Sequence, residues 1–363
     1  MKADAGETPS ETLEIDLEAL VEDITTIAAI PSPTFAEEAR LDWIAKRLAH
    51  SSGRLHRDSV GNVIWSWGEA RPSVLLTAHV DTVFPISTPL VIARRGDRLV
   101  GPGVGDNAAA IAVVIHVSEE LLRGRDLDHV AVAFTVGEEG LGNLRGARVV
   151  CSELGPSNVI AVEGHGLESV IADAVGSIRA RLAVTGPGGH AWQDRSHASA
   201  IHAIVELATE TLAEGEDGSP VNIGLISGGL AVNAIAGKAE LVLEKRSRDS
   251  ATLTRFVDYL HGLECDPSLH LDVEILGSRP AGRLSRESAL LGTVMTVRRA
   301  LGLPELVESG STDANAAIGM GIPALGLGVA YGADMHTAQE SIDVRSLVTG
   351  AEQLANVLIA IAG

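Results

Sequence analysis

Apolar residues recur along the chain in two spacings, which predict strands and helices. Short apolar runs predict buried strands at residues 74–78, 130–136 and 159–162. The helical spacing of apolar residues at 13–30 and the longer apolar stretch at 107–122 predict helices. Strands that alternate with helices in this way favour an α/β fold, in which helices sandwich a mixed, largely parallel sheet.

The pattern changes after Gly176. Residues 178–185 alternate apolar and polar positions, which is typical of a half-exposed antiparallel strand. The segments that follow have the order β-α-β-β-α-β, which is the ferredoxin-like arrangement. These segments are the strands at 178–185, 221–227, 239–246 and 269–276 and the helices at 198–213 and 251–262. After Pro280 the α/β pattern returns, with a helix at 288–301.

This change of pattern predicts two domains and a tail. We expect residues 177–280 to form an inserted α+β domain, and residues 13–176 and 281–363 to build the main domain together. Residues 1–12 are polar and acidic, so we expect a disordered tail and no signal peptide. No apolar run approaches the roughly 20 residues that a membrane-spanning helix needs.

The composition argues against several kinds of partner. With 28 Lys and Arg residues against 48 Asp and Glu residues, the formal net charge is −20. This charge argues against binding to nucleic acid or to anionic membranes, because both attract basic patches. The two cysteines, Cys151 and Cys265, lie outside any CxxC pair, which predicts reduced thiols in a cytoplasmic protein and no zinc–thiolate site.

Side chains that commonly bind metals follow the ends of the predicted strands. His79 and Asp81 come directly after the strand at 74–78, and two residues that are two apart in an extended chain point to the same side. This spacing suits His79 as a metal ligand whose imidazole is oriented by Asp81. The alternative is a histidine in a surface loop.

Two adjacent carboxylates, Glu138 and Glu139, follow the strand at 130–136. Adjacent carboxylates next to a buried strand repel each other and lose hydration, which is costly unless a cation is present. One of them can bind metal while the other acts as a general base toward a water that the metal activates. A solvated acidic turn is the alternative.

Three further candidates complete the pattern. A glycine-rich turn at 101–105 leads into Asp106, which either caps the following helix or bridges two metals with its two oxygens. Glu163 follows the strand at 159–162, and His336 lies downstream of an apolar run at 322–329. Because sites form at the carboxyl ends of strands in open α/β sheets, these residues predict one site for hard or borderline metal ions. His165, one residue beyond the strand end, is a weaker candidate ligand.

Together these motifs resemble the co-catalytic zinc metallopeptidase and amidohydrolase family. That family includes glutamate carboxypeptidase, acetylornithine deacetylase, succinyl-diaminopimelate desuccinylase and peptidase T. Each motif alone is weak, but their order and spacing agree over essentially the whole chain. The matching segments are 77–83, 101–106, 137–140, Glu163, 188–191 and 336–337.

The resemblance implies a ligand set for two zinc ions per subunit, which cobalt or manganese could replace. His79 and Glu163 would hold one metal, Glu139 and His336 the other, and Asp106 would bridge the two.

The resemblance also implies residues that act without binding metal. Glu138 would be the general base and acid, and Asp81 would orient His79. His190, in the inserted domain, would reach the partner subunit's site and stabilise the tetrahedral oxyanion, so the resemblance implies a homodimer through that domain. A turn residue without this role is the alternative for His190.

Substrate contacts are expected from the inserted domain. Asn233 lies in a segment similar to one that holds an asparagine in the family. Arg246 and Arg279 could bind a substrate carboxylate in bidentate geometry, or could simply form salt bridges. The turn at 311–315 also resembles a family turn near the site.

The expected reaction is hydrolysis of an amide or peptide bond in a small peptide or an N-acyl amino acid. The absence of Arg and Lys around Asp106 weakens the deacetylase and desuccinylase substrates, and the turn at 311–315 favours the peptidase T-like branch. Glu163, in contrast, is more typical of the carboxypeptidases and deacylases. An aminopeptidase of the peptidase T type therefore remains an alternative. A non-catalytic peptide-binding relative is a further alternative, which the presence of Glu138 disfavours.

Overall fold

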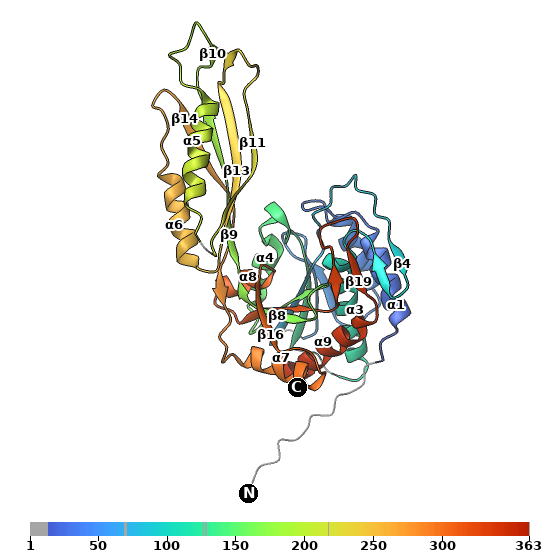
Figure 1. Ribbon diagram of the computed structural model, residues 1–363. Helices are drawn as coiled ribbons and strands as arrows, with labels where there is room; N and C mark the ends of the chain where they lie inside the picture. The colour runs from blue at the N-terminus through green and yellow to red at the C-terminus, as the bar shows by residue number, and fades with distance from the viewer. Residues whose placement is uncertain (1–13, 69–70, 126, 128, 217, 363) are drawn as a thin grey trace. The chain divides into compact units, whose positions relative to one another are not determined.

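The computed structural model describes residues 14–68, 71–125, 127, 129–216 and 218–362 (Figure 1). The expected tail at 1–12 lies outside the described residues. The chain forms two compact units, of which unit 2 is Ala174–Gly282 and unit 1 comprises the chain before Ala174 and after Gly282. Within the described residues, no helix is long and apolar enough to cross a membrane.

Unit 1 is built on one large mixed sheet. Its strand order is β1-β2-β6-β3-β7-β17-β8-β15, and β16 pairs with β8. The four central strands, β6, β3, β7 and β17, run parallel, while β1, β2 and β8 pair antiparallel with their neighbours. The predicted α/β fold with a largely parallel sheet is confirmed. The strands are β1 (Arg54–Arg57), β2 (Val63–Ser66), β3 (Val74–His79), β6 (Val130–Thr135), β7 (Val159–Glu163), β8 (Ser169–Ala174), β15 (Gly282–Arg283), β16 (Leu306–Gly310) and β17 (Ala324–Gly328).

Alternate residues of the central strands enter cores on opposite faces of this sheet. On β3, Leu76 packs into the core that includes α1, α2, α3, α7 and α9, whereas Leu75 packs into the core that includes α4 and α8. Because both faces are covered, the central strands are largely apolar, and polar residues stand mainly at their ends. The helices are α1 (Leu17–Ala28), α2 (Glu38–Arg47), α3 (Ala110–Leu122), α4 (Arg145–Leu154), α7 (Ala289–Ala300), α8 (Ala314–Gly319) and α9 (Ser346–Ala362). Helices α7 and α9 lie side by side (Figure 1).

A second, small sheet in unit 1 joins distant parts of the chain. Its order is β18-β19-β5-β4, and all the pairs are antiparallel. The pairing of β5 with β19 brings the residues before the glycine-rich turn next to the segment around His336. The strands are β4 (Ala93–Arg95), β5 (Arg98–Val100), β18 (Gly332–Ala333) and β19 (Ser341–Asp343).

Unit 2 has the β-α-β-β-α-β order that the alternating pattern predicts. Its four-stranded antiparallel sheet has the order β11-β13-β9-β14, and α5 and α6 pack on one face of it (Figure 1). A two-stranded ribbon of β10 and β12 accompanies this sheet. The elements are β9 (Gly176–Thr185), β10 (Gly189–His190), α5 (Ala200–Ala213), β11 (Val221–Gly228), β12 (Ala234–Ile235), β13 (Lys238–Ser247), α6 (Ser250–His261) and β14 (His270–Arg279).

The helix expected at 107–122 begins later than its apolar pattern indicates. A π-helical turn, Val104–Ala109, precedes α3, and the backbone of Asp106 and Asn107 is not helical. The polar side chains of these two residues bind groups outside the helix, which explains why the regular helix starts only at Ala110.

Candidate metal centre

Asp106 lies between two histidines that are far apart in the sequence. Its Oδ1 is 3.0 Å from Nε2 of His79, and its Oδ2 is 2.9 Å from Nε2 of His336. His79 is the last residue of β3, and His336 lies in the connection between β18 and β19. One carboxylate therefore faces an imidazole with each of its oxygens.

Two groups of candidate ligands share this carboxylate. His79, Asp106 and Glu163 form one group, and Asp106, Glu139 and His336 form the other. In each group the potential ligand atoms lie within 4.8 Å of one another. Oε2 of Glu163 is 3.7 Å from Nε2 of His79, and Oε1 of Glu139 is 3.2 Å from Nε2 of His336. The structure thus brings together all five residues that the sequence suggests as ligands.

The parallel strands explain this convergence. His79 and Glu163 end β3 and β7, which are neighbours in the sheet, and Glu139 follows β6 on the other side of β3. Parallel neighbours end at the same edge of the sheet, so the residues that end or follow them lie close together.

Asn107 fixes the loop of Asp106 to the end of β7. Its Nδ2 donates to the carbonyl oxygen of Val162 at 3.1 Å, and its Oδ1 accepts from the backbone N–H of Gly164 at 2.9 Å. The residue between these two contacts is Glu163.

The N-cap residue of α3 is Ala109. The alternative in which Asp106 caps this helix is therefore wrong.

Asp81 is fully buried and accepts hydrogen bonds from the backbone N–H groups of two consecutive residues. Its Oδ1 and Oδ2 accept from the backbone N–H groups of Glu138 and Glu139, each at 2.9 Å, and Oδ2 also accepts from Oγ1 of Thr34 at 2.8 Å. Oδ1 of Asp81 is 3.6 Å from Nδ1 of His79. The carboxylate of Asp81 therefore joins the strand end that carries His79 to the turn that carries the two glutamates.

Glu138 is buried and belongs to neither ligand group. It follows β6, whose last residue, Thr135, donates through Oγ1 to Oδ2 of Asp313 at 2.5 Å. The turn at 311–315 therefore lies beside the strand that leads to the two glutamates.

A buried arginine holds the turn between His79 and Asp81. The guanidinium of Arg40, on α2, donates to the carbonyl oxygens of Val80 at 2.9 Å and Ile30 at 2.8 Å. Burial lowers the pKa of Arg40 to about 10, so the side chain remains cationic at neutral pH. It contributes positive charge next to a group of carboxylates.

The candidate ligands perturb one another strongly. Burial favours the neutral form of His79, but hydrogen bonds with Asp106, Asp81 and Glu163 outweigh it and hold the pKa of His79 well above its usual value. Hydrogen bonds with Asp106 and Glu139 raise the pKa of His336 to about 10. Burial would raise the pKa of Asp106, but hydrogen bonds with His336 and His79 lower it below the usual range. Burial also raises the pKa of Glu163.

These residues fit a pair of metal ions. Three carboxylates and two imidazoles supply oxygen and nitrogen ligands, which suit zinc, cobalt or manganese. Without metal, protons on His79 and His336 balance part of the negative charge, and a bound cation would take the place of these protons.

His190 and Asn233, both in unit 2, lie next to each other. His190 pairs with Ala234 in the β10–β12 ribbon, and the backbone carbonyl of Asn233 accepts from the N–H of Ala191 at 3.1 Å. Both side chains are exposed. Nδ1 of His190 accepts from the backbone N–H groups of Trp192 at 3.2 Å and Gln193 at 3.3 Å.

Arg246 and Arg279 lie on opposite sides of the same strand of unit 2. Each is paired in register with Ser177 of β9, one from β13 and the other from β14. Glu244 accepts from Nε of Arg246 at 2.5 Å and from Nε of Arg179 at 2.6 Å. Burial, followed by the charge of Arg279, lowers the pKa of Arg179. Glu244 therefore pairs with Arg179 and Arg246, and Arg279 lies close enough for its charge to act on Arg179. Arg179 is the member of this arginine group that sequence reasoning missed.

Comparison with known proteins agrees with the predicted family. The pattern of peptidase family M20/M25/M40 matches residues 75–360. An uncharacterized protein YqjE of Bacillus subtilis is 24% identical over 308 residues, which cover 79% of this chain and 80% of that protein. A succinyl-diaminopimelate desuccinylase of Herminiimonas arsenicoxydans is 25% identical over 282 residues, which cover 70% of this chain and 75% of that protein.

A solved structure shares the fold over nearly the whole chain. The crystal structure of a tripeptidase from Staphylococcus aureus superposes with a TM-score of 0.81 at 21% identity, covering 97% of this chain and all of that one. The family match spans well over half of the sequence and includes all five candidate ligands. The chain therefore belongs to peptidase family M20/M25/M40.

Proposed function

We propose that the protein is a two-metal hydrolase that cleaves an amide or peptide bond in a small peptide or an N-acyl amino acid. The observation that carries this proposal is the position of Asp106, which belongs to both ligand groups and faces a histidine with each oxygen. Zinc is the metal we expect, with His79, Asp106 and Glu163 at one position and Asp106, Glu139 and His336 at the other. When bound, the metals supply Lewis acidity at the scissile carbonyl and lower the pKa of water.

Glu138 is the proposed general base and acid. Its side chain is buried, it lies next to the candidate ligand Glu139, and its backbone is held by Asp81. In this role its carboxylate accepts a proton from the attacking water and passes it to the nitrogen of the leaving amine. The oxygen of the water becomes part of the product carboxylate.

His190 is the proposed donor to the oxyanion of the tetrahedral intermediate. Because Nδ1 accepts from two backbone N–H groups, the neutral imidazole carries its proton on Nε2. An Nε2–H group is a hydrogen-bond donor without a full charge, which suits a negative charge that develops only in the transition state. The exposure of the β10–β12 ribbon leaves this donor accessible to a metal centre, which we propose is that of a partner subunit.

A homodimer through unit 2 is supported by apolar surface. Strand β11 is an edge strand, and Leu225 and Ile226 on it are exposed by 68% and 58%. On α5, Val205 and Leu212 are also exposed. Edge strands with large apolar side chains pair readily with another chain, and a second copy offers the same edge. Sedimentation should therefore give a dimer, and Ile226→Lys should shift it toward the monomer.

The three arginines of unit 2 are proposed to bind a substrate carboxylate. Arg179 and Arg246 pair with Glu244, and the charge of Arg279 acts on Arg179, so positive charge gathers in this part of the sheet. The C-terminal carboxylate of a peptide or of an N-acyl amino acid is the matching group. Asn233, exposed beside His190, is the proposed polar contact to the substrate backbone.

Cys151 and Cys265 form no disulfide, which supports a reducing compartment, and we propose the cytoplasm.

A substrate panel tests the proposed function. After a chelator has removed its metal, the protein should hydrolyse dipeptides, tripeptides or N-acyl amino acids only when zinc, cobalt or manganese is added back. Each peptide is also supplied with an acetylated amino terminus, because an aminopeptidase loses the blocked substrate whereas a carboxypeptidase or deacylase retains it. Bound metal with no turnover of any of these substrates would instead favour a non-catalytic peptide-binding protein.

A further inference from the structure

The side chain of Glu340 is completely buried beside the metal centre. The proposed mechanism gives this carboxylate no role. It accepts hydrogen bonds from three backbone N–H groups of the glycine-rich loop. Oε2 accepts from Gly103 at 2.9 Å, and Oε1 accepts from Gly105 at 2.8 Å and from Asp106 at 2.7 Å. The last of these donors is the N–H of the residue that both ligand groups share.

His165 completes the environment of Glu340. Its Nε2 lies 3.0 Å from Oε1 of Glu340, and since an ionised carboxylate only accepts, His165 is the donor. Its imidazole packs against Gly105 and Gly332, at both of which a Cβ atom would overlap the ring. His165 thus contacts Glu340 and belongs to neither ligand group, although it lies only two residues after Glu163.

The backbone of Glu340 ties the same loop to the segment of His336. Its carbonyl oxygen accepts from the N–H of Gly101 at 2.8 Å, and the next residue, Ser341, pairs with Val100 in the β5–β19 ladder. Glu340 lies four residues after His336. One residue therefore connects the loop that carries Asp106 with the segment that carries His336.

We propose that Glu340 is a positioning residue of the metal centre, whose carboxylate sets the place of Asp106 relative to His336. This inference rests on the proposed function, because it assigns Glu340 to the support of the same two metal positions. The chemistry fits a carboxylate and not an amide: two oxygens accept from four N–H donors, whereas a glutamine would turn an NH₂ group toward one set of these donors. Removing a group that holds a metal ligand in place typically lowers metal affinity about 10- to 100-fold.

Cobalt titration of the full-length chain tests the proposal. Glu340→Ala and Glu340→Gln are prepared with the wild type, their folding is checked by circular dichroism and thermal unfolding, and Co²⁺ binding is followed by visible absorption. We expect Glu340→Ala to lower cobalt affinity about 10- to 100-fold and to change the absorption spectrum. Glu340→Gln should lie between Ala and the wild type, because one oxygen still accepts. With metal saturating, kcat should fall more than KM changes.

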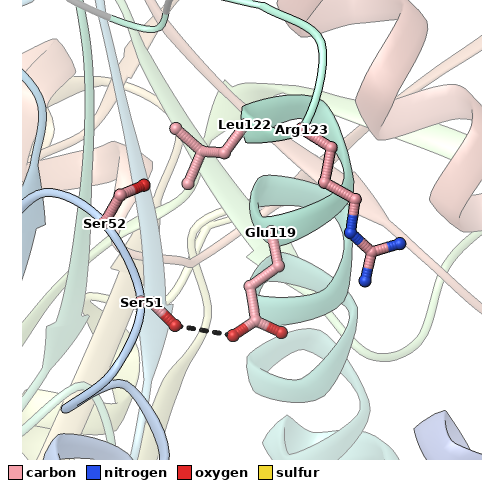
Figure 2. A pocket seen from close by; sticks show the side chains of 5 residues that line it. All are labelled: Ser51, Ser52, Glu119, Leu122 and Arg123. Carbon is pink, nitrogen blue, oxygen red and sulfur yellow. Dashed lines mark hydrogen bonds between the residues drawn. The ribbon is translucent and has the colours of Figure 1, made fainter.

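Glu119 provides a matched control in the same unit. Its carboxylate accepts from both terminal nitrogens of Arg47. It also accepts from Oγ of Ser51, beside a surface cavity of about 310 Å³ (Figure 2). It lies on α3, nine residues after Ala110 and hence roughly 14 Å along the helix from its first residue. Glu119→Gln should lower thermal stability and leave the cobalt affinity and spectrum unchanged.

The outcomes separate the two proposals. A folded Glu340→Ala that binds cobalt with the affinity and spectrum of the wild type overturns the role of Glu340. If Glu340→Ala does not fold, the same result for Glu340→Gln overturns it. A wild-type chain that binds no metal contradicts the proposed function, and the proposal about Glu340 with it.

Discussion

Oδ2 of Asp106 lies 2.9 Å from Nε2 of His336, although 230 residues separate the two in the chain. The other oxygen of Asp106 faces His79, at the end of a central strand. Unit 1 therefore assembles its candidate metal centre from the parts of the chain on both sides of unit 2. An insertion between these parts leaves the centre intact as long as the parallel sheet and the small sheet keep their registers.

Replacing Asp106 with asparagine should remove the shared ligand with little change in shape. The amide offers one oxygen instead of two, so the two metal positions can no longer share it. We expect weaker metal binding, with fewer than two metals per protomer after dialysis, and hydrolysis reduced at least about 100-fold. Elemental analysis and initial rates measure both effects. Two tightly held metals and a normal rate in this variant would argue against a shared carboxylate.

Metal binding should release protons. Hydrogen bonds with carboxylates raise the pKa of His336 to about 10 and hold that of His79 well above its usual value, so both are protonated at neutral pH without metal. A metal ion must displace these protons, so zinc should release about two protons per protomer and bind more tightly as the pH rises from about 6 to 8. Calorimetric titration in buffers of different ionisation enthalpy counts the protons. A binding enthalpy that does not depend on the buffer would exclude this competition.

His190→Ala should slow the chemical step without altering the metal centre. Loss of one donor to the oxyanion typically costs about 100- to 1,000-fold in kcat, and because the contact develops in the transition state, KM should change little. Metal content should remain that of the wild type. His261→Ala, at the exposed end of α6 in the same unit, is the control and should match the wild type. A normal kcat for His190→Ala would rule out the donor role.

The network around Glu119 should make stability depend on pH. Burial would raise the pKa of Glu119, but hydrogen bonds with Arg47 and Ser51 outweigh it and lower that pKa. A carboxyl group whose pKa is lower in the folded state stabilises the protein at pH values above its unfolded-state pKa. This stabilisation is lost as the pH falls through the folded-state pKa. Glu119→Gln should therefore reduce the free energy of unfolding by about 1–2 kcal/mol at pH 7. The difference from the wild type should shrink below about pH 4.

Urea unfolding at several pH values measures this difference. Glu120→Gln is a suitable control, because Glu120 pairs with a largely exposed Arg123 and exposed pairs contribute little. An effect of Glu119→Gln that stays constant from pH 7 to pH 3 would show that the ionised carboxylate is not its source.

The sequence predicts well which candidate ligand side chains come together, because they follow the ends of buried strands. His79, Glu139 and Glu163 follow or end β3, β6 and β7, and the order of parallel strands is enough to bring them together. Asn107 and Glu340 could not be found in this way. Asn107 binds the backbone on both sides of Glu163, and Glu340 binds the backbone of residues 101–106. Backbone donors and acceptors are the same at every position, so such contacts leave no pattern in the sequence.

The elements that sequence reasoning missed have local causes. Helix α4 begins after Asn143 and Leu144, both of which have positive φ, and its first residues lack a side-chain cap. Strands β18 and β10 are only two residues long, which is too short for an alternating pattern. These short strands place His336 and His190, so the positions of the two histidines depended on pairing that only the structure reveals.

The most direct test of the central claim is the rate and metal content of Glu138→Gln. The account assigns Glu138 to proton transfer and to neither metal position, so this variant should bind two metals per protomer with the affinity of the wild type. Its kcat on the best substrate should fall about 100- to 10,000-fold, because the amide cannot accept the proton of the attacking water. A Glu138→Gln variant that retains both metals and hydrolyses the substrate at nearly the wild-type rate would contradict the account.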